Sequence, residues 1–411
     1  MTSLVDGTLR MKADAAASSD ACSDQQQPVN FEDYGLSPQL LRGIYASGFE
    51  KPTQIQQKAI LPIKNGKDTI VQAQSGTGKT GAFTIGLLSQ IDFRQKKIQA
   101  IVLSHTRELA LQTNEVISKI GAHCMEDGSI FCHAFTGGTP VREDLKKIQE
   151  GTIVANCTPG RILDILNKEA FDPKQVKIIV IDEADEMLSQ GFQESVYKFF
   201  TYAPRDVQLV LVSATMPKEV LELAEKFLRD PEKILVEKTK LTLDGLKQYY
   251  VETDETSNEG GKKLPVLMDL LNPISNNQTV IFVNTKRRAD FVTQTLAESG
   301  YSPSAIHSDM STEDRKEIME SFYNGRSRIL IATDLIARGI DVQQVSIVIN
   351  YDMTENWETY LHRIGRAGRF GRKGISINFV SKDDKELLIK IEEHYNTKII
   401  ELPRNFMDAL V

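Results

Sequence analysis

The stretch "DTIVQAQSGTGKT", residues 68–80, says most about how this chain folds. It begins with a short apolar run, continues through a glycine-containing loop that ends in Gly-Lys-Thr, and opens the helical text "GAFTIGLLSQI". A strand, such a loop and a helix in this order are typical of nucleotide-binding α/β proteins, in which backbone N–H groups face phosphates. The stretch therefore predicts a parallel sheet flanked by helices, with a nucleotide site where the first helix begins.

The residues of this loop carry separate parts of the predicted chemistry. Gly76 and Gly78 let the backbone turn its N–H groups toward phosphates. Lys79 is expected to reach the β- and γ-phosphates, and the Thr80 hydroxyl to ligate Mg²⁺. The alternative is a flexible loop before an unrelated helix, but the order of strand, loop and helix favours the nucleotide site. The predicted cofactor-binding residues here are Ala73, which replaces the usual first glycine, Gln74, Ser75, Gly76, Thr77, Gly78, Lys79 and Thr80.

Similar apolar runs recur along the chain. "AIVLSHT", "TIVANCT", "KIIVIDE" and "QLVLVSAT" lie in the first half, and "QTVIFVNT", "RILIATD", "VSIVINYD" and "ISINFVS" in the second. Continuous rather than alternating runs, with helical text between them, are typical of strands buried on both faces of a parallel sheet. The sequence therefore predicts two doubly wound α/β domains. The expected division is a disordered tail over 1–28, a first domain over 29–237, a linker over 238–246 and a second domain over 247–411.

Length and composition agree with this organisation and exclude other classes. A chain of 411 residues exceeds the size at which one core usually stops growing. No run approaches the ~20 apolar residues of a membrane span, and we expect no secretory signal. The four scattered cysteines lack metal-ligand spacing and fit a reducing compartment. A net charge of -7 argues against general binding of polyanions but leaves room for a local basic groove.

Two apolar runs of the first half end in short polar motifs. "DEAD", Asp182–Asp185, follows "KIIVI", and a carboxylate at the carboxyl end of a buried parallel strand points into the ligand crevice. Asp182 is expected to hold Mg²⁺, and Glu183 to orient or deprotonate an attacking water. Ser213 and Thr215 of "SAT" are candidates for coupling this site to another one, with an ordinary helix cap as the alternative.

Three further turns combine hydroxyls, glycines and arginines. They are "TRELA" (Thr106–Ala110), "TGG" (Thr136–Gly138) and "TPGR" (Thr158–Arg161). Such groups contact a sugar–phosphate backbone without reading bases. Each turn could be a simple helix cap, but three at one sheet edge favour a groove that follows a nucleic-acid backbone.

The stretch "HRIGRAGRFGRKG", residues 362–374, places four arginines three residues apart among glycines. A basic patch for nucleic acid is the general interpretation of such a run. Side chains three apart rotate progressively around a continuous helix, so these four arginines would not share a face. The glycines instead indicate a segment that leaves the helix and presents its arginines one at a time.

In this order, the motifs resemble those of the DEAD-box family of ATP-dependent RNA helicases over residues 31–411. The resemblance implies two tandem RecA-like domains, ATP with Mg²⁺ as cofactors, and RNA-stimulated ATP hydrolysis coupled to domain closure and local duplex unwinding. It is nearest to the translation-initiation branch, which implies a cytoplasmic monomer that works with a scaffold protein. The alternatives are an ATP-gated RNA clamp of the nuclear exon-junction branch and a nucleotide-dependent interaction module without hydrolysis.

The resemblance also assigns single residues around ATP. Gly48–Gln56 resembles the adenine-sensing motif, in which Phe49 would stack on the base and Gln56 would bond its edge, with Phe31 as the upstream aromatic. Asp341 would meet the ribose. The catalytic residues would be Lys79, Asp182, Glu183, His362, Arg366 and Arg369, the last three completing the site from the second domain, while Arg363 would be structural.

For RNA, the resemblance adds Asn284, Arg315 and Thr333 in the second half. The predicted RNA-binding residues are then Thr106, Arg107, Gly137, Thr158, Arg161, Asn284, Arg315 and Thr333. The chain departs from the family pattern with His105 for proline, Cys157 and Ser308 for glycine, and Thr312 for glutamine. These departures fall among the RNA-facing motifs, and every catalytic position is filled.

Overall fold

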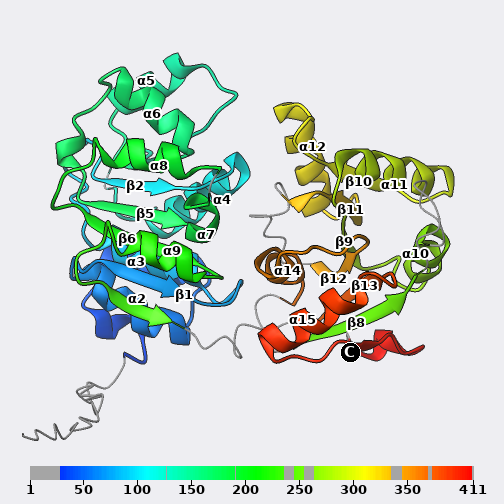
Figure 1. Cartoon of the computed structure of the whole chain (residues 1–411). Helices are drawn as coiled ribbons and strands as arrows, with labels where there is room; N and C mark the ends of the chain where they lie inside the picture. The colour runs from blue at the N-terminus through cyan, green and yellow to red at the C-terminus, as the bar shows by residue number, and fades with distance from the viewer. Residues whose placement is uncertain are drawn as a thin grey trace, which may run out of the picture.

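The structure, a computed structural model, describes residues 28–125, 127–189, 191–235, 245–253, 263–334, 345–368 and 373–409. Two parallel seven-stranded sheets lie in two lobes, each with helices on both faces (Figure 1). We call residues 28–235 lobe 1 and residues 245–409 lobe 2. The predicted fold class is confirmed. The predicted tail lies outside the described residues except for residue 28, as does the predicted linker except for residues 245 and 246.

Lobe 1 is built on a sheet whose strands are buried on both sides. Along β5, Val180 packs toward α1–α4, whereas Ile179 and Ile181 pack toward α6–α9, because successive side chains of a strand point to opposite faces. In spatial order the strands are β3 (Cys132–Phe135), β4 (Val154–Cys157), β2 (Ala100–Leu103), β5 (Ile178–Asp182), β6 (Gln208–Ser213), β1 (Thr69–Gln72) and β7 (Glu232–Leu235). The helices are η1 (Phe31–Tyr34), α1 (Pro38–Ala46), α2 (Gln54–Lys64), α3 (Lys79–Leu88), α4 (Arg107–Ile120), α5 (Val141–Gln149), α6 (Pro159–Asn167), η2 (Pro173–Gln175), α7 (Ala184–Met187), α8 (Gln193–Phe200) and α9 (Lys218–Ala224).

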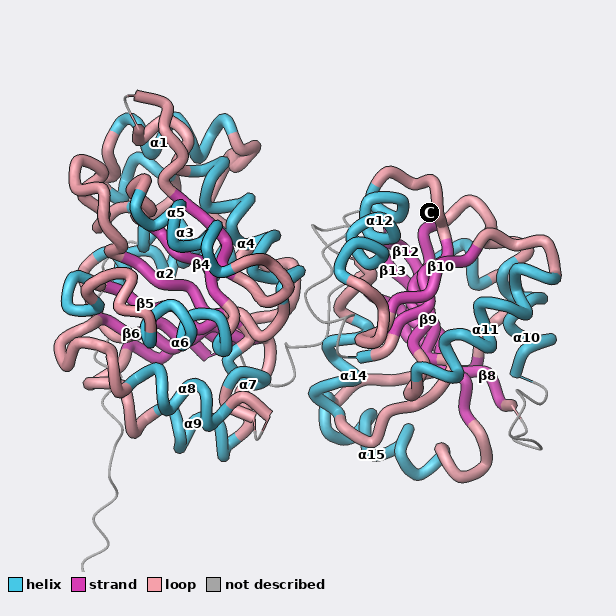
Figure 2. The backbone as a smooth tube through the Cα atoms, turned by 90° about the horizontal axis from the view of Figure 1, so that it is seen from above, coloured by secondary structure: helices cyan, strands magenta, loops and turns pink. Residues whose placement is uncertain are grey.

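Lobe 2 repeats the same plan. Along β9, Ile281 packs toward α10 and α11, whereas Val280 and Phe282 pack toward α12. In spatial order the strands are β10 (Pro303–Ile306), β11 (Ile329–Ala332), β9 (Gln278–Phe282), β12 (Val345–Asn350), β13 (Gly374–Val380), β8 (Leu246–Glu252) and β14 (Ile400–Glu401). The helices are α10 (Lys263–Leu271), α11 (Lys286–Glu298), α12 (Thr312–Tyr323), α14 (Trp357–Ile364), α15 (Lys385–Tyr395) and η4 (Phe406–Ala409). Seen from above, the strands form the middle layer of each lobe (Figure 2).

The strand order places the predicted motifs. In both lobes the order is third, fourth, second, fifth, sixth, first and seventh strand of that lobe. The first, fifth and sixth strands, which lead into the phosphate loop, "DEAD" and "SAT", are therefore neighbours. The second, third and fourth strands, which lead into the three backbone-contact turns, are also neighbours. One sheet edge of lobe 1 thus has a nucleotide half and a nucleic-acid half, because parallel strands present their carboxyl ends at the same edge.

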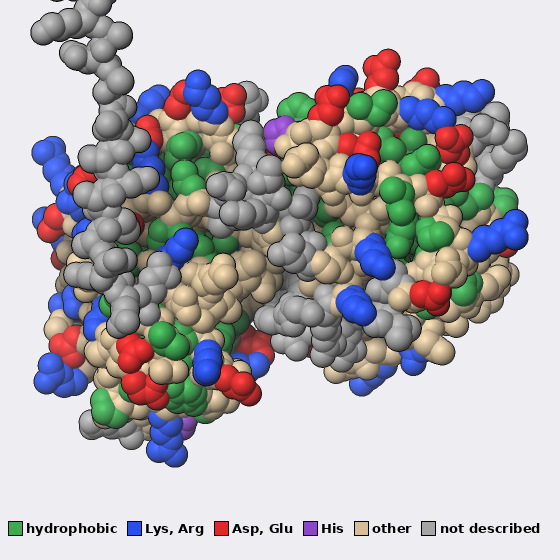
Figure 3. Space-filling model, turned by 90° about the horizontal axis from the view of Figure 1, so that it is seen from below, with side chains coloured by type: hydrophobic (Ala, Val, Ile, Leu, Met, Phe, Trp, Pro, Cys, Tyr) green, Lys and Arg blue, Asp and Glu red, His purple; other side chains and the backbone are tan. Residues whose placement is uncertain are grey.

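Helices of both lobes lie on the sides that face each other. The short α7 and the longer α4 lie on the side of lobe 1 that faces lobe 2, opposite α14 and α12 (Figure 1). On the face shown in Figure 3, Lys and Arg side chains are interspersed with Asp and Glu on both lobes. In the described part of the chain, no helix combines the length and the apolar character that crossing a membrane requires.

Candidate functional site

The phosphate loop connects β1 to α3 in a conformation that suits an anion. Gly76 and Gly78 have φ angles of 78° and 98°, in the left-handed region that favours glycine. Gly78 is the N-cap of α3, where helix N–H groups lack intrahelical partners. The Lys79 Nζ donates hydrogen bonds to the carbonyl oxygens of Ala73 (2.7 Å) and Gln74 (2.9 Å). An ammonium group folded over a glycine turn at the N-terminus of a helix can take a phosphate.

Gln56 joins the start of α2 to this loop. Its Oε1 accepts a hydrogen bond from the Thr53 N–H (2.9 Å), and Thr53 Oγ1 caps the helix in return. Its Nε2 donates to the Gly78 carbonyl oxygen (3.3 Å), while Thr53 Oγ1 donates to the Thr77 carbonyl oxygen (2.8 Å). The helix-cap and nucleotide-sensing interpretations therefore apply to the same side chain, because one amide serves the helix start and the loop.

Phe49 lies next to Gln56 against the first turn of α3. A Cβ atom at Gly81 would lie 2.8 Å from Gln56 Nε2 and 3.1 Å from the Phe49 ring, so only glycine allows this close approach. The Phe31 ring meets the Phe49 ring edge-on at 6.4 Å. The structure thus brings the predicted adenine residues together beside the phosphate loop, whereas Asp341, predicted for the ribose, lies outside the described residues.

Two carboxylates stand at the end of β5. Asp182 is 4% exposed, and burial together with the charge of Glu183 raises the pKa of Asp182 to about 7. Burial would also raise the pKa of Glu183, but the positive charges of His362, Lys79 and Arg366 outweigh it and lower that pKa. Glu183 has a φ of 50°, and its buried Oε2 has no hydrogen-bond partner among the described residues. A strained non-glycine backbone with an unused carboxylate oxygen is typical of a functional position.

Lobe 2 reaches this site through α14. The His362 Nε2 lies 2.8 Å from the Asp185 Oδ2, and the Thr215 Oγ1 donates a hydrogen bond to the same oxygen. The Thr215 N–H is bonded in turn to the Ser213 Oγ (3.3 Å). Burial would raise the pKa of Asp185, but the charge and hydrogen bond of His362 hold it below its usual range. Asp185 therefore links the "SAT" turn of lobe 1 to lobe 2.

Arg366 also crosses to lobe 1, whereas Arg363 does not. The Arg366 Nη2 donates to the Ser75 Oγ in the phosphate loop (3.3 Å). Arg363 is buried in lobe 2 at 1% exposure, where its Nε and Nη2 donate to both carboxylate oxygens of Asp334 (2.5 and 2.8 Å). Arg369 lies outside the described residues. Arginines three positions apart thus face different lobes.

Glu183, Asp185 and His362 also form a possible cation site. Within the described residues, their ligand atoms all lie within 4.8 Å of one another. Because His362 comes from lobe 2, this group needs both lobes together. The residues predicted to hold Mg²⁺ are different ones, Asp182 and Thr80, and both carry oxygen ligands of the kind Mg²⁺ prefers.

The predicted RNA-facing turns of lobe 1 lie side by side at the other half of the edge. Thr106 caps α4, its Oγ1 accepting from the Leu109 N–H (3.3 Å). The Arg107 Nη1 donates to the Gly137 carbonyl oxygen (3.2 Å), which ties the first turn to the second. Thr158 is the N-cap of α6, and no side-chain capping bond occupies its hydroxyl. These groups line three adjacent strand ends.

Arg161 is placed differently from the expected backbone contact. It is 8% exposed and forms a buried ion pair with Asp144 of α5. Its Nη2 also donates to the Thr139 carbonyl oxygen (2.7 Å). The guanidinium therefore holds the turn that follows β3 and does not face solvent, because the buried carboxylate of Asp144 needs a partner.

Of the predicted RNA-facing residues of lobe 2, Asn284 and Thr333 follow two adjacent strands, and Arg315 lies in α12. The Asn284 Nδ2 donates to the Met353 carbonyl oxygen (2.8 Å) and its Oδ1 accepts from the Arg363 Nη2 (2.8 Å). Thr333 follows β11, the neighbour of β9. The Arg315 Nη1 lies 3.1 Å from the Glu108 Oε1 of α4, which is a second contact between the lobes.

The partners in these interlobe contacts were not predicted. Sequence reasoning missed Asp185 and Glu108 as partners of His362 and Arg315. Asp185 and His362 are 177 residues apart, and spacing carries no signal for a pair that forms only when two separate lobes meet. Both Asp185 and Glu108 nevertheless lie in motifs quoted above, "DEAD" and "TRELA". The motifs therefore indicated functional residues, but they did not indicate which residues would pair.

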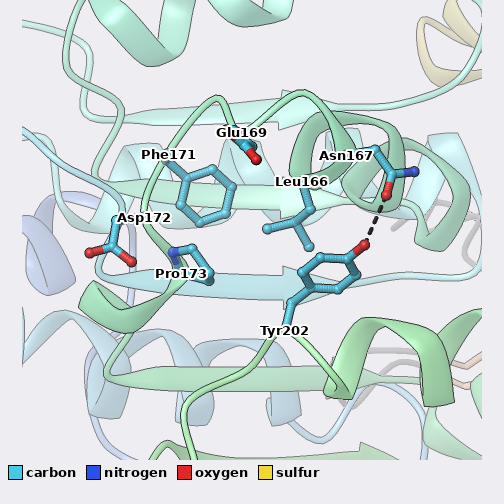
Figure 4. A pocket seen from close by; sticks show the side chains of 7 residues that line it. All are labelled: Leu166, Asn167, Glu169, Phe171, Asp172, Pro173 and Tyr202. Atoms are coloured by element: carbon cyan, nitrogen blue, oxygen red, sulfur yellow. Dashed lines mark hydrogen bonds between the residues drawn. The ribbon is translucent and has the colours of Figure 1, made fainter.

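A surface pocket lies away from all these residues. It has a volume of about 570 Å³ and takes its apolar surface from Leu166, Phe171, Pro173 and Tyr202, with the Tyr202 hydroxyl donating to Asn167 Oδ1 (2.9 Å; Figure 4). It adjoins the end of α6 and η2 before β5, so it lies opposite the edge that carries Asp182. None of the predicted site residues lines it.

Comparison with known proteins agrees with this arrangement. Residues 53–223 match the family described as DEAD/DEAH box helicase, and residues 262–371 match the helicase conserved C-terminal domain. A "Probable eukaryotic initiation factor 4A" of Trypanosoma cruzi (strain CL Brener) is 54% identical over 377 residues, covering 92% of each chain. An "ATP-dependent RNA helicase eIF4A" of Mycosarcoma maydis is 50% identical over 381 residues, covering 93% of this chain and 91% of that one. The structure of S. cerevisiae Dbp5 bound to RNA and ADP BeF3 has a TM-score of 0.82 at 34% identity, covering 91% of this chain and 95% of that chain.

The chain therefore belongs to the DEAD/DEAH box helicase family, as the motifs predicted. The relatives that carry an initiation factor 4A name match it over nearly its whole length, which confirms the expected branch.

Proposed function

We propose that this chain is an ATP-dependent RNA helicase of translation initiation, in which RNA-stimulated ATP hydrolysis is coupled to closure of the two lobes and to local unwinding of RNA duplexes. The observation that carries this proposal is the contact of Arg366 from lobe 2 with Ser75 in the phosphate loop of lobe 1, at 3.3 Å. A site assembled from two lobes works only when they are together. A ligand that spans both lobes can therefore control hydrolysis.

In this proposal the nucleotide half of the edge holds ATP. Lys79 neutralises the β- and γ-phosphates, while Phe49 and Gln56 bind adenine. Asp341 and the remaining loop residues complete the nucleotide contacts. Arg366 and Arg369 stabilise the charge that develops on the transferred phosphoryl group, an effect worth ~10³–10⁵ in rate in related enzymes.

Thr80 and Asp182 would hold Mg²⁺. The fit rests on Asp182, because the raised pKa of this buried carboxylate indicates a position that gains from added positive charge. The ion supplies Lewis-acid polarisation of the phosphate oxygens. Glu183 orients the attacking water and takes its proton, for which its lowered pKa keeps it ionised.

The nucleic-acid half of the edge would bind RNA along its backbone. Thr106, Arg107, Gly137 and Thr158 of lobe 1 and Asn284, Arg315 and Thr333 of lobe 2 provide hydroxyl, amide, guanidinium and backbone groups without any aromatic base platform among them. Such contacts give little sequence preference and weaken with salt. Arg161 supports RNA by holding the neighbouring turn.

Ser213 and Thr215 would couple the two halves, since Thr215 and His362 share Asp185. The protein acts as a monomer with a scaffold protein of the initiation-factor type in the cytoplasm. The support for these last points is the length and level of the match to the relatives named above.

ATP turnover measured with and without single-stranded RNA tests the proposal. We expect strong stimulation by RNA, strand separation of a short duplex with ATP, and loss of both in Glu183→Gln. Equal turnover with and without RNA would refute the coupling. A long-lived complex with ATP and RNA but without unwinding would instead favour the clamp of the exon-junction branch. Repeating the assay with an initiation-factor scaffold fragment tests the partner.

A further inference from the structure

The orientation of α14 is the feature that the proposed reaction depends on. His362 lies in α14 and Arg366 lies two residues beyond its last residue, and both side chains contact lobe 1. All six residues Thr359–Ile364 are buried. The rotation of α14 must then be fixed by the side of the helix that packs on the sheet of lobe 2. Apolar contacts alone resist rotation and sliding of the helix only weakly, because they have no preferred direction.

Tyr360 provides a directional contact on that inner side. It is 1% exposed, and its hydroxyl donates to the Gln248 Oε1 of β8 at 2.7 Å. The same hydroxyl accepts a hydrogen bond from the Asn378 Nδ2 of β13 at 3.3 Å. One phenol group thus bonds to two neighbouring strands at once.

The amides behind Tyr360 continue through the sheet. The Asn378 Oδ1 accepts from the Asn350 Nδ2 of β12 (2.7 Å), and the Asn378 Nδ2 also donates to the Tyr249 carbonyl oxygen (2.9 Å). On the other side, the Gln248 Nε2 donates to the Thr397 Oγ1 (3.2 Å). The resulting chain of bonds runs from the centre of the sheet, through Tyr360, to the segment after α15.

This chain of bonds is costly compared with apolar packing. Asn350 and Asn378 are fully buried, and Gln248 is 6% exposed. Burying amides costs free energy that their hydrogen bonds only recover, whereas apolar residues of similar size would add stability. The Asn350 Oδ1 is buried without a partner among the described residues, but the hydrogen bonds that the network does make specify one geometry, since each bond requires a fixed direction.

We propose that Tyr360 is a positioning residue of the ATP site, and that the Asn350–Asn378–Tyr360–Gln248 network fixes α14 so that His362 and Arg366 meet lobe 1. This inference rests on the proposed function, because it assigns Tyr360 a role only through those two residues. Within the described residues, the hydroxyl bonds of Tyr360 go to Gln248 and Asn378 and do not reach the phosphate loop. Because catalytic groups lose about 10²-fold when misplaced by ~1 Å, a small rotation of α14 is sufficient for a large effect.

Tyr360→Phe in the full-length chain tests the proposal. It removes one hydroxyl and keeps the ring. We expect the RNA-stimulated kcat to fall at least tenfold, while the KM for ATP and the affinity for single-stranded RNA without nucleotide stay within twofold. Tyr301→Phe is the matched control, since the Tyr301 hydroxyl also bonds within lobe 2, to Asn272 Oδ1 (2.8 Å) and the Met268 carbonyl oxygen (3.2 Å), away from α14.

Two further measurements separate positioning from simple destabilisation. We expect the thermal midpoints of the two variants to drop by similar amounts. We also expect Asn378→Ala to reproduce the kcat loss of Tyr360→Phe, with no additional loss in the double variant, because both act through one network. A Tyr360→Phe variant that keeps kcat within twofold, or a Tyr301→Phe variant that loses as much, would overturn the proposal. Additive losses in the double variant would also overturn it.

The NMR signals of the His362 imidazole provide a readout that needs no catalysis. We expect these signals to shift in Tyr360→Phe and not in Tyr301→Phe, because the contact with Asp185 changes. This result would support the positioning role even if wild-type turnover proved independent of RNA, in which case only the proposed function would fail. Unchanged His362 signals in both variants would contradict the positioning role.

Discussion

The two lobes contain the same sheet with different chemistry at its edge. In lobe 1, the fifth strand ends at Asp182, a carboxylate whose pKa is raised by burial and by the charge of Glu183. In lobe 2, the fifth strand is followed by Asp352, which lies 3.6 Å from the Lys263 Nζ and accepts a hydrogen bond from the Asn284 N–H at 3.1 Å. The same place in the topology thus carries an available carboxylate in one lobe and a neutralised one in the other. The strand order therefore determines where a nucleotide site can form, and the charge pairing of the carboxylate at that place determines whether it is available to a ligand.

The largest expected effect separates these two carboxylates. Asp182→Asn should lower the RNA-stimulated kcat by about 10³-fold or more, because it removes the predicted Mg²⁺ ligand. Asp352→Asn should leave kcat within about tenfold and lower the free energy of unfolding by about 1–3 kcal/mol, because it weakens a buried ion pair and hydrogen bond. Steady-state ATPase and chemical denaturation measure both. Similar kcat losses in the two variants would break the comparison between the lobes.

The next effect concerns two arginines of lobe 2 that face opposite ways. Arg366→Lys should reduce kcat by ~10³-fold with little change in stability, since a lysine lacks the planar fork that reaches the phosphate loop. Arg363→Lys should instead cost about 3–5 kcal/mol of stability, because it breaks the buried bidentate pair with Asp334. Arg366→Lys should therefore lower kcat and leave the denaturation midpoint nearly unchanged, whereas Arg363→Lys should mainly lower the denaturation midpoint. A stable Arg363→Lys with impaired catalysis would show that this residue acts in the site.

A smaller effect concerns the interlobe pair on the RNA side. The pair of Glu108 and Arg315 has side chains 19% and 20% exposed, so we expect Glu108→Gln to cost about 1 kcal/mol of closure and about fivefold in the RNA concentration for half-maximal ATPase. Glu115→Gln is the control, because Glu115 pairs with Lys119 on the same helix α4 but is 64% exposed. A change in Glu115→Gln as large as that in Glu108→Gln would rule out a specific interlobe contribution.

The smallest effect is a pH dependence of stability in the nucleotide-free protein. Because the pKa of Asp182 is raised to about 7 in the folded state, that state binds more protons than the unfolded chain between about pH 4 and 7. The contribution of Asp182 to stability should therefore decrease as pH rises through this interval. Thermal midpoints of the wild type and Asp182→Asn should diverge between about pH 4 and 7 in favour of the variant, and should stay a constant amount apart above pH 7. Midpoints that stay equally far apart from pH 4 to 7 would exclude the raised pKa.

Much of the fold was predictable because its signals are local. The predicted apolar runs form strands of four to seven residues that are buried on both faces, and the strand, loop and helix around Gly76 and Gly78 form as expected. The family follows from the same motifs. Spacing also placed the nucleotide and nucleic-acid turns at one edge, since parallel strands align their carboxyl ends.

Individual site residues were predictable only where a side chain and its partners lie in the same turn. Lys79 lies over its own loop, but Arg161 turns inward to Asp144 although its text, "TPGR", matches a backbone-contact turn. No local pattern distinguishes an arginine that meets a phosphate from one that neutralises a buried carboxylate. The role of Arg161 depends on its partner, Asp144, which lies on another helix, α5.

The two α/β sheets, the phosphate loop and the residue types at the strand ends follow from the sequence alone, because backbone geometry and apolar burial act over short stretches. Which arginine faces which lobe depends on the tertiary structure. The contact of His362 with Asp185, over a separation of 177 residues, depends on it too. Such contacts depend on how the two lobes come together. The spacing of residues in the sequence carries no information about which side chains are buried or paired where the lobes meet.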